Sequence, residues 1–390
     1  MLKGRALLVG LLAVGGAYLV VRTAAVEAYA DANPSRAASI WPGHPKVLVS
    51  QALTEIGIAA VKRQPPPTEA LERIDQAGRA SPLLHDPFLT RAIRARQAGN
   101  LRLAEAALVA ARQRAPREAA PRYFLSQLYL TSGRARQGLA ELATLARLLP
   151  HGAASVAPSL AAYARSSGDV ANLKATFRSN PELEQAVLVE LSKNPANADI
   201  AFRLANRFRE ADGSAPDWVK VMLPRIVEAG QADKAYGLWE GVSGVRTRGR
   251  LFDPTFTASK APPPFNWVLR SDSAGFAEPD GKGGLHALFY GREDAVLATQ
   301  TMLLLPGSYT LSLKVAGNSG GMLRWTIACV PGGREILTLG LGSAANSTPT
   351  GRFAVPEACR AQRIDLRGVA GELSKQADVS ISGLTLARQE

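Results

Sequence analysis

Histidine and cysteine are both scarce in this sequence. The chain of 390 residues has four histidines and two cysteines. The histidines are scattered, and none has a second ligand at the spacing that zinc sites use. We therefore expect no metal site and no metal cofactor at any of them, namely His44, His85, His151 and His286.

The sequence matches two functional motifs by letter, but neither lies in the structural context that its chemistry requires. "GNSGG" at 317–321 matches the nucleophile-elbow pattern, but Ser319 lies between two predicted strands instead of on a strand-to-helix turn. "GLGSAA" at 340–345 is followed by further strand, so no helix N-terminus is present to bind a pyrophosphate. No pair of carboxylates is evident either. We expect no catalytic residue and no cofactor, and an enzyme of carbohydrate processing is the weakest hypothesis.

Acidic residues are too few to balance the basic ones. The chain has 46 Lys and Arg against 33 Asp and Glu, a net charge of +13. Residues 85–150 alone hold 11 Arg against 4 acids, whereas the part from Leu251 onward is nearly neutral. Such a surface can attract phosphate, anionic lipid or acidic polysaccharide, and the alternative is an ordinary solvated helix face. The 46% hydrophobic and 20% charged composition excludes a disordered chain.

The N-terminus carries a basic prefix and an apolar run. Lys3 and Arg5 precede the uncharged residues 6–21, which would span roughly 24 Å as a helix. We expect a membrane segment with its N-terminus in the cytoplasm and the bulk of the chain on the far side, which argues against nucleic acid as a partner. "AYA" at 28–30 fits signal peptidase, but Arg22 and Glu27 precede it, which favours a retained anchor over a cleaved signal.

The two cysteines lie in the same C-terminal part of the chain. In an oxidising compartment, an isolated pair most simply forms one disulfide, here Cys329–Cys359. The loop closed would stabilise the fold by about 3–4 kcal/mol in the chain-entropy account. The alternative is two buried free thiols.

Glycine and proline recur with a fixed period between residues 85 and 150. Gly99 and Gly133 are 34 residues apart, and so are Pro116 and Pro150. This period is typical of stacked helical hairpins, and few such arrays are stable below three units. We expect a third unit near 160–181 and a further hairpin around Trp218 and Trp239, interrupted at Pro224, with helices to about residue 243. Two lead-in helices are predicted at 46–63 and 68–82.

The two clear units resemble tetratricopeptide repeats. Small residues at fixed positions let the two helices of a hairpin approach closely, and large residues fill the gap to the next hairpin. In the first unit the matching residues are Phe88, Ala92, Ala95, Ala104, Leu108, Ala111 and Pro116, with Arg91 where the family has Leu. In the second they are Leu125, Ser126, Tyr129, Gly138, Leu142, Leu145 and Pro150.

The hydrophobic period changes to two after residue 264. In "SYTLSLKVA" the residues Tyr309, Leu311, Leu313 and Val315 share one face. "MLRWTIAC" alternates in the same way, which places Trp325 in the core. About eight short strands bounded by Gly and Pro indicate a β-sandwich.

The sandwich resembles the jelly-roll modules of the carbohydrate-binding type. The similar segments are "FDPTF", "PFNW", "LPGSYTLSLKV" and "SISGLTLAR". The resemblance implies that exposed rings could stack on sugars, with Phe265, Trp267 and Tyr290 as the candidates. Only Asp253 is left of the acidic residues that hold calcium in such modules, so no calcium site is expected.

Together, the anchor, the repeats and the sandwich resemble a membrane-anchored protein family of bacterial exopolysaccharide systems. The predicted fold class is multidomain, α plus all-β, with domains at 1–30 (membrane helix), 31–84 (lead-in helices), 85–243 (repeats), 244–264 (linker) and 265–390 (sandwich). The resemblance implies a single-pass inner-membrane protein with a periplasmic bulk, or a secreted periplasmic form if cleaved. We expect a non-catalytic scaffold that binds envelope proteins through its repeats; the alternative is a polysaccharide-binding protein acting through the sandwich, with acidic polysaccharide as a candidate ligand.

Overall fold

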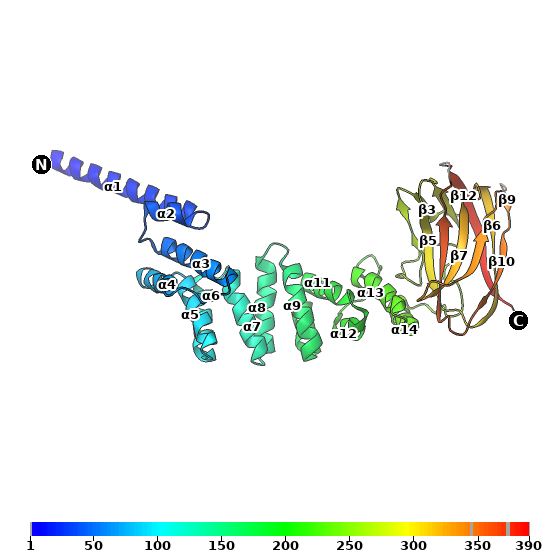
Figure 1. Cartoon of the computed structure of the whole chain (residues 1–390), viewed down its shortest axis with the longest axis horizontal. Helices are drawn as coiled ribbons and strands as arrows, with labels where there is room; N and C mark the ends of the chain where they lie inside the picture. Colours follow the sequence, from blue (N-terminus) through cyan, green and yellow to red (C-terminus); the bar gives the residue numbers. More distant parts are fainter. Residues whose placement is uncertain (1, 344–345, 372–374, 390) are drawn as a thin grey trace. The chain divides into compact units, whose positions relative to one another are not determined.

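The chain forms helices over its N-terminal part and antiparallel strands over its C-terminal part (Figure 1). The computed structural model describes residues 2–343, 346–371 and 375–389. An apolar N-terminal helix, a helical region and a C-terminal β-sandwich appear in the predicted order, which confirms the fold class. The chain divides into two compact units, residues 1–156 and 157–390. This division falls inside the predicted repeat region 85–243, so the predicted domain limits stay predictions.

Unit 1 consists of helices that pack mostly on their neighbours in sequence. The first is long and apolar, and its side chains are described from Gly10 onward. Gly10–Tyr29 has the length and hydropathy of a membrane span or a signal sequence. The helices are α1 Leu2–Tyr29, α2 Pro34–Ile40, α3 Pro45–Val61, α4 Thr68–Ala80, α5 Asp86–Gln97, α6 Leu101–Arg114, α7 Ala119–Thr131 and α8 Ala135–Leu148.

The hairpins α5–α6 and α7–α8 turn at the two glycines that set the 34-residue period. Gly99 and Gly133 both have φ +75°, a left-handed conformation that disfavours other residues. After the first turn, the Asn100 side chain accepts a hydrogen bond from the backbone N–H of Leu103 and caps α6. The sequence period therefore corresponds to a repeated local geometry.

Unit 2 begins within α9 and contains two more turns of this kind. Gly168 and Gly230 have φ +63° and +79° between α9 and α10 and between α13 and α14. The predicted interruption at Pro224 is wrong, because α13 runs unbroken through that proline. The helices are α9 Gly152–Ser167, α10 Val170–Arg178, α11 Pro181–Ser192, the 3-10 helix η1 Pro195–Asn197, α12 Ala198–Leu204, α13 Asp217–Glu228 and α14 Ala232–Ser243.

The strands of unit 2 form two antiparallel sheets. One sheet has the order β1-β5-β11-β7-β8, and the main path of the other is β10-β6-β12-β4-β3-β2, with β9 paired to β6. The strands are β1 Val268–Leu269, β2 Ser271–Asp272, β3 Gly275–Pro279, β4 Gly284–Phe289, β5 Ala295–Met302, β6 Gly307–Asn318, β7 Leu323–Val330, β8 Glu335–Gly340, β9 Asn346–Ser347, β10 Thr350–Val355, β11 Ala361–Gly368 and β12 Ala377–Arg388.

The core of the sandwich contains the residues that the two-residue period predicts. Trp325 is fully buried, and Tyr309, Leu311, Leu313 and Val315 all belong to the same cluster of buried side chains. The disulfide Cys329–Cys359 is present and links the end of β7 to the connection before β11, as predicted. The alternation therefore identified the buried face correctly.

Candidate functional sites

The repeat-signature residues of unit 1 lie between the helices of the two hairpins. Position 138 on α8 needs a glycine, because a Cβ atom there would lie 2.7 Å from the Leu130 side chain on α7. Phe88 is half-buried, with the Arg114 guanidinium 3.8 Å from its ring centre. The signature residues that are buried are Ala92, Ala95, Ala104, Leu108, Ala111, Leu125, Ser126, Tyr129, Gly138, Leu142 and Leu145, while Pro116 and Pro150 are exposed after α6 and α8.

Two carboxylates connect the hairpins through arginines. Glu141 on α8 is buried and accepts hydrogen bonds from Arg112 of α6 and Arg122 of α7. Arg134 donates to both oxygens of Glu105 at 2.7 and 2.9 Å, and these bonds lower the pKa of the Glu105 carboxyl. Such bidentate pairs fix geometry as well as neutralising charge. Part of the Arg excess therefore serves to hold the repeats in register.

An apolar groove of about 310 Å³ opens between α5, α6 and α7. Its floor is made by Ala92, Ala104, Leu108 and Phe124. Ile93 is 37% exposed at the same place. Arg96 and Gln97 also line the groove and supply polar groups beside the apolar floor. A concave apolar surface with a few polar neighbours is typical of a binding site.

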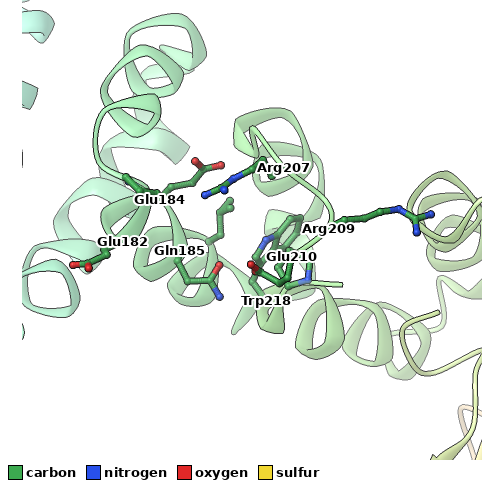
Figure 2. Close-up of a pocket in the computed structure, with 10 residues that line it drawn as sticks. Glu182, Glu184, Gln185, Arg207, Arg209, Glu210 and Trp218 are labelled. Atoms are coloured by element: carbon green, nitrogen blue, oxygen red, sulfur yellow. The ribbon is translucent and has the colours of Figure 1, made fainter. Parts of the chain in front are cut away.

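A second cavity, of about 360 Å³, lies in unit 2 beside the irregular segment 205–216 (Figure 2). Glu184 of α11 is buried and accepts hydrogen bonds from the backbone N–H and side-chain amide of Asn206, at 2.6 and 3.1 Å. This carboxylate therefore holds the segment in place. Arg209 points away from the cavity in Figure 2 and donates to the Val242 and Ser243 carbonyls at the end of α14.

The rings predicted to contact glycan differ in their accessibility. Phe265 is 2% exposed and packs on Tyr236 and Trp239, which corrects the expectation that it contacts sugar. Trp267 is half-buried, stacks near Phe256, and donates its Nε1–H to the Asp253 carbonyl at 2.9 Å. Of the three rings, Trp267 and Tyr290 keep part of their surface accessible, whereas Phe265 does not.

A polar cluster on the outer face of the five-stranded sheet was not found from the sequence. The Asp365 carboxylate on β11 is 1% exposed and accepts hydrogen bonds from the Thr299 hydroxyl at 2.6 Å, Arg363 at 3.0 Å and Arg367 at 3.1 Å. On β7, Thr326 stands directly opposite Asp365. Its buried hydroxyl has no hydrogen-bond partner among the described residues.

Cavities flank this cluster on the same sheet face. One, of about 330 Å³, is lined by Thr326, Arg324 and Arg367 together with Glu335 and Asp294. Another, of about 450 Å³, is lined by Asp365, Arg363 and Thr299, among other residues. Positive and negative groups are mixed there, so the face offers both donors and acceptors. The Thr326 hydroxyl has no accessible surface, so the groups that a ligand can reach there are the half-buried Arg324 and Arg367 and the exposed Glu335 and Asp294.

The sequence signal for this cluster was an acid in the middle of a strand, with an arginine two residues to either side. "QRIDLRG" places Arg363, Asp365 and Arg367 on one side of the strand, which is ordinary for an outer face. Thr299 and Thr326, which lie beside Asp365, come from β5 and β7, which are far away in the sequence. Local patterning could not bring these strands together.

Comparison with known proteins gives likenesses in structure but not in sequence. No protein-family profile and no curated protein matches the chain. One similar solved structure is "CBM4 structure and function", with 15% identity and a TM-score of 0.30, over 36% of this chain and 99% of that chain. Another is TmCBM61 in complex with beta-1,4-galactotriose, with 18% identity and a TM-score of 0.26, over 37% and 100%. Yeast Tom70 has 15% identity and a TM-score of 0.29, over 54% and 45%.

Proposed function

We propose that this protein is a non-catalytic, membrane-tethered scaffold that binds another envelope protein through its helical repeats, in exopolysaccharide or cell-envelope assembly. The observation that carries the proposal is the groove between α5, α6 and α7, whose apolar floor is open to solvent at Ile93. Interface energy concentrates in apolar pockets of this kind, with polar groups at the rim. The proposal assigns no catalytic role to any residue.

The packing of the end of α1 supports a retained anchor. The "AYA" segment at 28–30 belongs to the folded unit, since Ala30 is fully buried in one cluster with Val26, Ala37 and Val47. Cleavage after Ala30 would separate Val26 and Ala30 from that cluster. The proposal therefore places the chain at the membrane, with the bulk on the outer side, in the inner membrane of a bacterium.

The test is photo-crosslinking in intact cells. A photoreactive phenylalanine analogue at Ile93 is expected to capture a discrete protein partner, because this side chain lies in the groove and is accessible. The same analogue at Ala106, which is exposed on α6 but does not line the groove, is the matched control. Capture of the same proteins at both positions, or of none at Ile93, would contradict the proposal.

A second function, polysaccharide binding by the sandwich, is favoured by the outer face of the five-stranded sheet. Arg324, Arg367, Glu335 and Asp294 line the cavity of about 330 Å³ and keep accessible surface, so they can bond to sugar hydroxyls or carboxylates. This interpretation replaces ring stacking at Phe265 with hydrogen bonding on a polar face.

The corresponding experiment measures polysaccharide affinity of the full chain and its Arg324→Gln variant. The variant removes the guanidinium from the cavity wall, so binding of acidic polysaccharide is expected to weaken about tenfold or more, in line with about 1.5–3 kcal/mol for one hydrogen bond to a charged group. Arg352→Gln, on the edge strand β10 of the other sheet, is the matched control, since Arg352 is exposed and does not line this cavity. Unchanged affinity in Arg324→Gln, or no binding by the unaltered chain, would remove this function.

A further inference from the structure

The first helix, α1, has two zones with different surroundings. From Gly10 to Val21 the described side chains are exposed, and the large apolar ones among them are between 52% and 70% exposed: Leu11, Leu12, Val14, Tyr18, Leu19, Val20 and Val21. From Val26 onward the helix packs on α2 and α3. The change from one zone to the other occurs at Arg22, the first charged residue after the apolar run.

The uncharged part of α1 approaches the length that is needed to cross a bilayer. Residues 6–21 rise by about 24 Å as an α-helix, which is at the short limit for crossing the hydrocarbon core. If α1 crosses the membrane, Arg22 therefore lies where the hydrocarbon ends and the headgroups begin. The remaining two turns of α1 extend into water and carry the contacts with the folded unit.

Helix α2 runs back along α1 toward that boundary (Figure 1). Near its start, the Arg36 guanidinium lies 4.3 Å from the ring centre of Tyr29. At its end, Arg22 donates to the Ile40 carbonyl at 3.0 and 3.1 Å, and its guanidinium lies 4.3 Å from the Trp41 ring centre. The C-terminal end of α2 is therefore level with Arg22.

The turn that follows α2 carries groups suited to a membrane interface. It consists of residues 41–44, "WPGH", in which the rings of Trp41 and His44 meet edge to face at 5.1 Å. Tyr18 lies one turn before Arg22 on α1, with its ring centre 6.0 Å from the guanidinium. Tryptophan and tyrosine are enriched at the headgroup level, where an apolar ring body and a polar N–H or O–H are both satisfied. Burial lowers the pKa of the His44 imidazole.

We propose that the turn 41–44 rests in the headgroup layer of the bilayer that α1 crosses, with Trp41 in direct contact with lipid. Unit 1 would then be attached at two points, the anchor and this turn, and held against the surface instead of hanging from a flexible tether. The partner is the phospholipid interface itself. This inference rests on the proposed function, because it requires α1 to be a retained membrane span.

The test is fluorescence quenching by brominated lipid. The full-length protein is reconstituted into vesicles of phosphatidylcholine and phosphatidylglycerol, with bromine placed near the headgroup or near the middle of the acyl chain. Both lipids are expected to quench the tryptophan fluorescence, and the lipid with bromine near the headgroup is expected to quench it more strongly. Of the five tryptophans in the chain, Trp41 is the one that belongs to unit 1, so Trp41→Phe is expected to remove most of the quenching. Trp267→Phe, in the sandwich, is the control and is expected to leave it unchanged.

The outcomes separate this inference from the function on which it rests. Resistance to alkaline extraction shows independently that α1 is inserted. If the chain is inserted but the quenching is absent, or is equal in the unaltered chain and in Trp41→Phe, the interfacial turn is contradicted and the anchor stands. If the chain is not inserted, both the anchor and the turn are contradicted.

Discussion

Replacing Trp239 with alanine is expected to lower the free energy of unfolding of unit 2 by about 3–5 kcal/mol, the usual cost of removing a buried aromatic side chain. Trp239 lies on α14 and is fully buried. Its Nε1–H donates to the Pro262 carbonyl at 2.7 Å, and its ring lies 5.6 Å, centre to centre, from both Phe252 and Phe265. The substitution therefore removes packing between α14 and the segment that leads into the sandwich.

The measurement is hydrogen exchange of unit 2 amides as a function of urea, which reports the stability of that unit within the full chain. Val221→Ala on α13 is the control, because Val221 is 40% exposed and surface substitutions usually stay within about 0.5 kcal/mol. A loss below about 1 kcal/mol in Trp239→Ala would mean that these aromatic contacts do not hold the segment 244–264 against the helices.

Short-range features were predictable because their causes are local. The glycines at 99 and 133 recur with the hairpin period and take the same backbone conformation in the structure. The alternation in β6 identified the buried side of the strand, and Trp325 is in the core as predicted. The cysteine pairing needed only two cysteines in one domain, and it is confirmed.

Features that depend on distant parts of the chain could not be predicted. The order β1-β5-β11-β7-β8 joins strands that are far apart in the sequence, and the hydrogen bond from Thr299 to Asp365 depends on it. Phe265 is a predicted sugar contact that the structure corrects, because the segment "PFNW" does not reveal which of its rings is exposed. In the structure the Phe265 side chain is buried against Tyr236 and Trp239. Pro224 was expected to interrupt a helix, but α13 accommodates it. The packing of α2 on the end of α1 had no sequence signal that we recognised.

The second prediction with a large expected effect tests the proposed membrane orientation of the chain. The apolar helix, the buried Ala30 and the disulfide all fit a chain that stays anchored and exposes its bulk to an oxidising compartment. Protease added outside spheroplasts is therefore expected to digest nearly all of the chain. It should leave a short membrane fragment that contains α1.

The most direct measurement is this digestion on a chain with an N-terminal tag, followed by detection of the tag in the membrane fraction. Rupturing the spheroplasts serves as the control, since it exposes both sides of the membrane. The account predicts that the full-length tagged band is converted to a fragment of a few kilodaltons while a cytoplasmic marker stays intact. A full-length band protected until the spheroplasts are ruptured, or a soluble chain that begins after Ala30, would contradict it.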